Sequence, residues 1–492
     1  MTGIRQKTGY IWAFLIAFLP RLFWSLQAIP LRTVSDELST MNGAVFFSSQ
    51  NWNAVVSKAG YYGFGMSILA TPLMQWIKDP VILYRTLLVC TGVLESVAAV
   101  ICFYLIKRVF GITDEKKALL MTVTISYITV VRTTVFYNEH MLMLISWCIC
   151  LVLAKLVLTE EPKKRAMWTG FFVLLMLYAL TVHARTTTYI FAAVLVIALY
   201  GLMYRKKMVS LSVFGILTAG GYLLIKKGTK IYQSVVWSAA EGVRNTRVNI
   251  GQEKLSLLKT ADGIKSCLFT IFGQINIASM ISGGLLITAL VMVILLIVRK
   301  GKEAFVLKTI QADNAQERLY FVIGSFFVLC TGMTIAAQSL TWIATAANAI
   351  AGGYGTKEYG TKAFTYLRYM MPYLQPLLML VFVTMEKQKD VFLSCFHKSI
   401  KYIVLFQGIW LAFILPYCYG NKQAGEEFIC FALADRNIAT AHTYLPATLV
   451  FVIMLLIFFQ AGKKEKFQVI MVVLLVVAGY KYCYNAYNWD IL

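Results

Sequence analysis

The chain has 492 residues, of which 59% are hydrophobic and only 14% are charged, and its formal net charge is +23. Apolar runs long enough to cross a hydrocarbon core of ~30 Å recur along the whole sequence, which indicates a polytopic membrane protein and excludes a soluble one. The positive charge lies in short clusters between these runs, as in cytoplasmic loops beside anionic lipid, and does not indicate nucleic-acid binding. The ten cysteines contain no CxxC pair, so a disulfide framework or a zinc site is not expected.

The apolar runs predict an all-α fold with about thirteen membrane-spanning helices, because irregular backbone cannot face lipid. The spans are expected near residues 9–29, 81–106, 118–136, 140–158, 166–182, 187–204, 208–225, 282–298, 319–337, 367–385, 402–418, 445–461 and 467–484. If Arg5 and Lys7 are cytoplasmic, the gaps on that side are rich in lysine and arginine, as the positive-inside rule requires. We therefore expect a multi-pass plasma-membrane protein with a cytoplasmic N-terminus.

One membrane domain is expected over residues 1–492, because no soluble domain interrupts the apolar runs. We divide it into a catalytic module, 1–205 with an outer loop at 30–80, and a variable module, 206–492 with an outer loop at 226–281. The apolar stretch 59–77 is rich in glycine and aromatic residues, and counting it as a span would invert the sides of all later spans. It is therefore expected to be an interfacial or re-entrant helix.

Carboxylates stand where the first span leaves the membrane, in the sequence "SDEL" at residues 35–38. In a structural interpretation, Ser35 caps a surface helix and Asp36 and Glu37 interact with its dipole. However, Glu139 is a second acid on the same outer side, in a loop so short that it must lie close to the membrane surface. Ionisable groups at this depth are costly and usually face a cavity or one another.

Several arginines lie at comparable depth and need partners, namely Arg21, Arg85, Arg132, Arg185 and Arg368. A structural interpretation pairs them with Asp36, Glu37, Glu139 or Glu95 as contacts between helices. Arg368 differs from the others because it is expected on the outer side, where arginine is rare, and has Tyr369 among the tyrosines around it. A guanidinium group in such a place suits a phosphate ligand.

An outer carboxylate beside guanidinium groups has the chemistry needed to transfer a sugar from a lipid phosphate. The phosphate leaves without an acid if cations neutralise its growing charge, so only the acceptor hydroxyl must lose a proton. A single carboxylate on the opposite face of the sugar can accept that proton, as in inverting glycosidases. Of Asp36 and Glu37, one would be the base and the other would orient it or contact the sugar.

These stretches resemble a known group of enzymes. The segment "RLFWSLQAIPLRTVSDELSTMNGAVFFSSQNW", the following "YYGFGMSILATPLMQWI" and the later "RYMMPYLQPLLML" are similar to the GT-C membrane glycosyltransferases. The likeness is to the branch of protein O-mannosyltransferases and lipid A aminoarabinose transferases, and "FYNEHMLML" fits its second acidic position. It covers the first ~200 residues and residues 360–385. It implies a GT-C-like fold with outer juxtamembrane helices.

The resemblance implies that Asp36 is the catalytic base and that Glu139 helps at the sugar or the acceptor. It also implies that Arg368 and Arg185, with the neighbouring Tyr369, hold a polyprenyl phosphate. Many members have Lys-Pro-Pro where this chain has "YYGFG", so a phosphate-contacting lysine is missing. The substitutes or additional contacts that we consider are Lys58, Arg85, Arg244 and Arg247, although a solvated or lipid-headgroup face is the preferred explanation for the last two.

A divalent metal is used by some members of the group and not by others. In this chain a sparse site could be formed by Asp36, Glu37, Glu139, His140 and His183. The alternative is that both histidines are polar helix-end residues, so metal dependence stays open and no other cofactor is expected.

Two other functions fit the same sequence. A polysaccharide or lipid transporter would also need many helices and buried ions, but the acids lie at span ends and no internal symmetry is seen. A glycan ligase or polymerase would use a large outer loop such as 226–281. The partners expected for the transferase are a polyprenyl-phosphate sugar donor, membrane lipid and a glycan, lipid or protein acceptor, with no nucleic acid. The sequence names neither the sugar nor the acceptor.

Overall fold

The computed structural model of the chain describes residues 2–28, 35–49, 62–128, 135–236, 252–307, 314–418, 441–464, 466–474 and 477. Within these ranges every regular element is helical. Eight helical segments are long and apolar enough to cross a membrane: 8–27, 80–109, 138–158, 162–182, 184–204, 261–281, 315–341 and 389–418. The chain is thus an all-α protein with membrane-spanning character, as predicted, whereas the count of thirteen spans stays a prediction.

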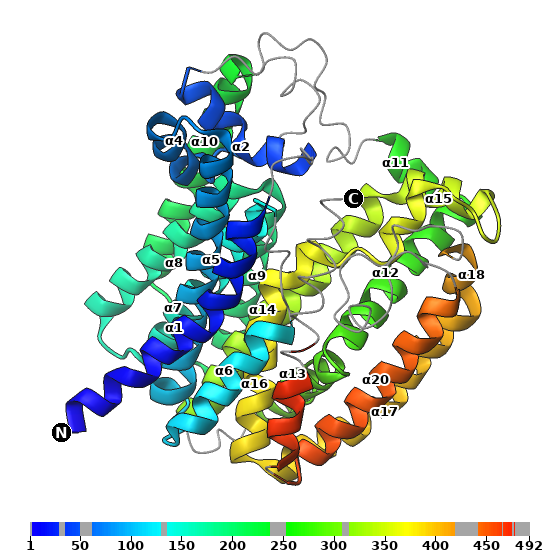
Figure 1. The fold of residues 1–492 in the computed structure, drawn as a ribbon. Coiled ribbons are helices and arrows are strands. Elements are labelled where there is room, and N and C mark those ends of the chain that lie inside the picture. Colours follow the sequence, from blue (N-terminus) through cyan, green and yellow to red (C-terminus); the bar gives the residue numbers. More distant parts are fainter. Residues whose placement is uncertain are drawn as a thin grey trace.

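The first half of the chain supplies one side of the bundle (Figure 1). Its long helices are α1 (Thr2–Gln27), α5 (Pro80–Tyr104), α6 (Glu115–Ile128), α7 (Asn138–Leu158), α8 (Pro162–Val182), α9 (Thr187–Tyr204) and α10 (Leu211–Val236). Its short elements are α2 (Ser35–Phe47), α4 (Ser67–Trp76), the π-helical turn η1 (Leu105–Val109) and the 3₁₀ turn η2 (Ala184–Thr186).

The second half forms the other side of the bundle (Figure 1). Its longer helices are α12 (Ala261–Ile281), α13 (Leu285–Gly301), α14 (Ala315–Thr341), α16 (Met371–Lys387), α17 (Lys389–Ile409) and α20 (Ala441–Ala461). Its short elements are α11 (Gln252–Leu257), η3 (Lys302–Leu307), α15 (Ile343–Ala351), η4 (Tyr359–Phe364), η5 (Arg368–Met370), η6 (Trp410–Ile414) and α18 (Leu415–Cys418).

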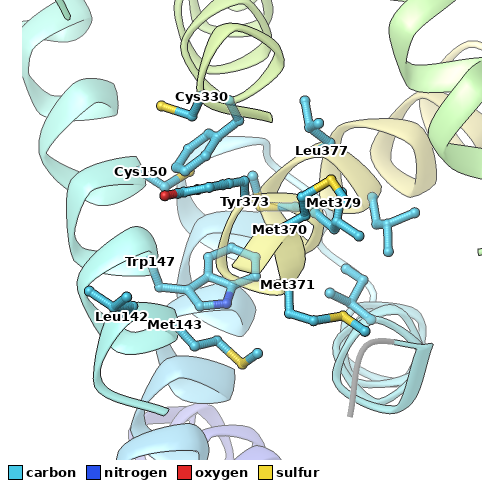
Figure 2. Packing of buried hydrophobic residues seen from close by; sticks show 14 of the residues in the cluster. Leu142, Met143, Trp147, Cys150, Cys330, Met370, Met371, Tyr373, Leu377 and Met379 are labelled. Carbon is cyan, nitrogen blue, oxygen red and sulfur yellow. The ribbon is translucent and has the colours of Figure 1, made fainter. Parts of the chain in front are cut away.

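The centre of the bundle is formed by α7, α14 and α16. Every residue from Met371 to Met385 of α16 is buried, as expected for a helix that is apolar on all sides. Figure 2 shows side chains of this core, and Trp147 of α7 donates its indole N–H to Gln375 of α16 at 2.7 Å. Helices of the two predicted modules therefore share one core rather than forming separate units.

The helices α2 and α4 pack against each other at the end of the bundle where α10 ends (Figure 1). They have 13 and 10 residues, which is too short to cross a membrane. For α4, this agrees with the prediction that the stretch 59–77 does not span the membrane. Tyr232 of α10 donates to the amide oxygen of Asn42 in α2 at 2.6 Å, which ties the three helices together.

The prediction of an outer loop over 226–281 is wrong for the described part of that range. Helix α10 continues to Val236, and α12 forms a second helix in which most residues are buried. The polar side chains that made this stretch resemble a loop find partners inside the fold. Thr270 donates to the carbonyl of Ser266, and Gln274 donates to the carbonyl of Ala363 at 2.9 Å. Because these polar groups are hydrogen-bonded, α12 can be buried although it is rich in polar residues.

Helices α12 and α13 follow each other along α14 with a break between them. The break lies at Gly283 and Gly284, whose φ angles are +56° and +80°. A side chain at either position would also collide with Phe458 or Leu455 of α20, so glycine is required both by the backbone and by the contact.

Candidate functional site

Asp36 lies in the first turn of α2 at the start of the helix, where a negative charge is favoured by the helix dipole. Its Oδ2 accepts a hydrogen bond from Nη2 of Arg368 at 2.5 Å, and its Oδ1 accepts one from the hydroxyl of Tyr62 at 2.5 Å. The side chain is 24% exposed, more than the other charged groups of the site. Asp36 is therefore held from two sides and still accessible.

Glu139 and two arginines complete what we call the charged cluster, which consists of Asp36, Glu139, Arg185 and Arg368. Glu139 is in the first turn of α7, and its Oε1 accepts from Nη2 of Arg185 at 2.7 Å. The same oxygen lies 3.5 Å from Nε of Arg368. Both arginines stand on short 3₁₀ turns: η2 joins α8 to α9, and η5 directly precedes α16. The fold thus brings together four residues from four separate elements.

Aromatic rings surround the two guanidinium groups of the charged cluster. Arg185 lies over the ring of Tyr369 with 3.8 Å between its Cζ and the ring centroid, and Arg368 lies over Tyr137 at 4.2 Å. Tyr366 is 5.4 Å from Arg368 on another side. A cation over an aromatic face is stabilised electrostatically. The tyrosine rings therefore hold both guanidinium groups in position.

Tyr62 reaches Asp36 because the sequence "YGFG" lies very close to the end of α8. The backbone N–H of Gly65 donates to the carbonyl of Thr181 at 2.9 Å. A Cβ at Gly65 would lie 2.5 Å from the hydroxyl oxygen of Thr181, and one at Gly63 would collide with the same residue's carbonyl. The glycines therefore allow the approach that stacks Tyr62 on His183, with 4.8 Å between the rings. Burial raises the pKa of Tyr62, so its hydroxyl stays protonated and donates.

The pKa of Asp36 is set by opposing effects. Burial raises it, but the charge of Arg368 and the hydrogen bond from Tyr62 lower it more, and the pKa of Asp36 falls below its ordinary value. Lys362 of η4 also contributes to this lowering. Asp36 is consequently ionised at neutral pH. Two carboxylates face two guanidinium groups here, and the nearby lysine gives the site an excess of positive charge.

Several buried N–H groups of this site have no hydrogen-bond partner among the described residues. They are Nε and Nη1 of Arg185, Nε of Arg368 and Nε2 of His183. Buried donors without acceptors are costly, so native structures rarely leave several together. All four are donors and the site is positively charged. The arrangement therefore fits a ligand that is rich in acceptor oxygens and carries negative charge, such as a phosphate.

Glu37 has a different environment from its neighbour Asp36. It is 2% exposed, and its Oε1 accepts from the backbone N–H of Phe136 at 2.7 Å and from the hydroxyl of Tyr84 at 2.8 Å. These bonds attach α2 to α5 and to the segment before α7. The described contacts of Glu37 are thus structural, and its role beside Asp36 in catalysis stays a prediction.

No described contact joins Arg85 to the charged cluster, so its expected phosphate contact stays a prediction. Its Nε donates to the carbonyl of Ala28 at 3.1 Å, which attaches Arg85 to the residue that directly follows α1. Arg21 forms a buried ion pair with Glu95, as the structural interpretation predicted. The other carboxylate oxygen of Glu95 accepts from Nδ1 of His140 at 2.6 Å. The remaining candidates Lys58, Arg244 and Arg247 lie outside the described residues.

The five residues considered for a metal site do not converge. His140 is turned toward Glu95, Glu37 is engaged with backbone and Tyr84, and Arg368 stands between Asp36 and Glu139. Within the ranges that the structure describes, no group of three or more histidine, cysteine, aspartate or glutamate residues could hold a metal ion. These residues do not fit a divalent metal, and we derive no chemical step through one.

A cavity of about 620 Å³ lies between α13, α14, α16 and α17, at the end of α16 opposite to Arg368. Helix α16 has 17 residues, so about 25 Å separates its ends. Arg299 and Glu317 at this cavity are paired with each other. None of the predicted site residues lines it, and its polar rim shows no buried group without a partner among the described residues. We therefore place the functional site at the charged cluster.

The sequence analysis missed Tyr62, Tyr137 and the stacking role of His183. The signal for Tyr62 was present in the closely spaced glycines of "YYGFG", which we interpreted only as the place of a missing lysine. Tyr137 directly precedes α7 and Glu139, but a tyrosine at a span end has a general explanation in the aromatic belt. Its contact with Arg368 depends on packing between distant segments.

No protein-family model matches the chain, and no curated protein matches it significantly. The structure itself defines the class: an all-α protein with membrane-spanning helices and a buried charged cluster at one end of the bundle. Any assignment to the GT-C glycosyltransferases rests on the sequence resemblance and on the chemistry of the cluster.

Proposed function

We propose that the protein is an inverting glycosyltransferase of the plasma membrane. It would move a sugar from a polyprenyl-phosphate-linked donor to an acceptor on the outer face, with its N-terminus in the cytoplasm. The observation that carries the proposal is the pairing of an accessible, ionised carboxylate, Asp36, with guanidinium groups that retain unused N–H donors. The carboxylate suits an acceptor hydroxyl, and the guanidinium groups suit a phosphate.

In the proposed reaction, Asp36 accepts the proton of the acceptor hydroxyl as the oxygen attacks the anomeric carbon of the sugar. A new bond forms between that oxygen and the anomeric carbon, and the bond from the carbon to the phosphate oxygen breaks. The phosphate keeps the electron pair, and its developing charge is stabilised by Arg368 and Arg185. Attack opposite to the leaving group inverts the anomeric configuration.

Glu139 would orient both arginines in this reaction, because its carboxylate contacts each of them. Tyr62 would keep Asp36 in place by its hydrogen bond. Tyr369 lies under Arg185 and beside Arg368, so its proposed contribution to binding is to hold these groups rather than to contact the phosphate directly.

The alternatives have less support. A ligase or polymerase was favoured by a large outer loop at 226–281, but much of that range belongs to α10 and α12. A transporter would bring ionisable groups together near the middle of the membrane, whereas Asp36 lies in the short helix α2 and Arg368 lies on the short turn before α16. A transporter would also release its lipid unchanged.

The test uses the purified full-length protein in lipid nanodiscs with polyprenyl-phosphate sugars as donors. The expected result is release of polyprenyl phosphate and transfer of the sugar, both lost in Arg368→Ala and kept in Arg85→Ala, a matched arginine outside the cluster. Mass spectrometry of envelope glycans from a deletion strain would name the missing sugar and its acceptor. Movement of intact donor between leaflets without its cleavage would instead show a transporter.

A further inference from the structure

His183 occupies a closed position beside the charged cluster. It directly follows α8, is 6% exposed and lies between two tyrosine rings. Tyr62 stacks on it at 4.8 Å with an angle of 29° between the planes, and Tyr369 lies 5.7 Å away on a tilted ring. Because Tyr62 also donates to Asp36, the imidazole is linked to the base through one side chain.

The tautomer of His183 follows from the hydrogen bond that its ring makes with the described part of the chain. Nδ1 accepts from the backbone N–H of Arg185 at 3.1 Å, so this nitrogen carries no hydrogen. Burial lowers the pKa of His183 well below its usual range, and the charges of Arg185 and Arg368 lower it further. The ring is therefore neutral, and its single hydrogen is on Nε2.

The Nε2–H group has no acceptor among the residues that the structure describes, although it is buried. It shares this state with Nε and Nη1 of the neighbouring Arg185. A third cation beside two guanidinium groups would be repelled, whereas a neutral imidazole adds a donor without that cost. The site thus contains a fixed, uncharged donor in addition to its two guanidinium groups.

We propose that His183 is a ligand-binding residue that donates its Nε2–H to a phosphate oxygen of the lipid-linked donor. This inference rests on the proposed function and adds a residue to it that neither the sequence pattern nor the ion pairs assign. The stacked ring of Tyr62 and the tilted ring of Tyr369 hold the imidazole in position. The hydrogen bond at Nδ1 keeps the ring hydrogen on Nε2, the nitrogen proposed to face the ligand. The histidine recognises phosphate oxygen irrespective of the pH changes that would charge an ordinary imidazole.

Two substitutions separate this role from a purely structural one. His183→Gln keeps an N–H donor near the position of Nε2 but loses the acceptor for Arg185. His183→Asn keeps an acceptor near the position of Nδ1 and is a good helix-start cap, but has no donor at Nε2. If His183 binds the ligand, the His183→Gln variant should bind it more tightly than His183→Asn. If His183 is only a structural cap, the His183→Asn variant should instead perform better than His183→Gln.

Binding of undecaprenyl phosphate to the full-length protein in nanodiscs is measured by native mass spectrometry, with the thermal midpoint of each variant measured in parallel. We expect His183→Gln to bind nearly as well as the wild type and His183→Asn to bind about tenfold more weakly, as for loss of a hydrogen bond to a charged group. Binding by His183→Asn equal to that of the wild type would overturn the proposal.

A measurement on the unaltered protein keeps the proposal testable if both variants unfold. The chain has only four histidines, so ¹⁵N-histidine labelling gives a simple NMR spectrum. We expect the signal of His183, a buried neutral histidine with its hydrogen on Nε2, to shift when phosphate binds. His140 is also buried, but its two ring nitrogens face Glu95 and the carbonyl of Val135, so its signal should not shift. A shift with inorganic phosphate shows that the phosphate group suffices, and a shift only with undecaprenyl phosphate shows that the lipid is required. No shift with either probe overturns the proposal.

Failure of this inference can be distinguished from failure of the proposed function. If the wild type binds undecaprenyl phosphate and Arg368→Ala abolishes binding, but His183→Asn does not weaken it, only the role of His183 is refuted. If the wild type retains no undecaprenyl phosphate, the proposed transferase and the ligand assigned to His183 are both refuted.

Discussion

The adjacent carboxylates Asp36 and Glu37 provide the sharpest test, because both stand in the first turn of α2 but have different partners. Asp36→Asn keeps the shape of the side chain and an oxygen for Tyr62, and Arg368 retains its contact with Glu139. We therefore expect folding and donor binding to change little. Loss of the general base should lower kcat by about 10²- to 10⁴-fold.

Glu37→Gln should have the opposite effect. The two described hydrogen bonds of Glu37, from Phe136 and Tyr84, are made to a charged, buried acceptor. A hydrogen bond to a charged group contributes about 1 kcal/mol more than a neutral one, so replacing the charge should cost about 2 kcal/mol of stability for the two bonds. The turnover of each folded molecule should stay that of the wild type.

The assay measures donor turnover and chemical unfolding for both variants in the same detergent, with undecaprenyl phosphate binding as the control for the site. Full turnover in Asp36→Asn would remove Asp36 as the base. If Glu37→Gln were instead as stable as the wild type and lost turnover, the structural role given to Glu37 would be wrong and its catalytic role restored.

Three further predictions concern the rest of the site and its support. The pKa of Asp36 lies below its ordinary value, so both its rate contribution and its ion-pair stability are present at neutral pH and are lost as pH falls through that lowered pKa. Tyr62→Phe removes one of the hydrogen bonds that lower this pKa and should therefore move the acid limb of kcat/KM to higher pH; an unmoved limb would contradict the assigned cause. Glu95→Gln leaves the buried Arg21 unpaired and should cost about 3–5 kcal/mol in denaturant unfolding, with recovery in the double variant that adds Arg21→Met. Gly65→Ala places a methyl against the end of α8 and should weaken substrate turnover more than stability, measured as kcat against thermal midpoint; unchanged turnover would show that this approach is dispensable.

The sequence alone was sufficient to predict helices with membrane-spanning character, and the reason is local. A segment with a long apolar run must satisfy its backbone within itself, so its length and composition predict a helix such as α7 or α14. The same reasoning failed for α12, because its buried polar residues are paired with other segments of the chain. The sequence of one segment alone does not show such pairing. It also located ionisable residues at helix ends, including Asp36, Glu139 and Arg368.

Only the tertiary structure decided which of these charges meet. Arg368 and Asp36 are 332 positions apart, and their contact exists because η5 and α2 are carried to the same end of the bundle by packing of the helices between them. Glu37, one residue further along α2, points to Phe136 instead, because successive side chains of a helix leave it about 100° apart. Charge and hydropathy are properties of a segment, whereas an ion pair depends on the positions of two segments, and those are fixed by the fold.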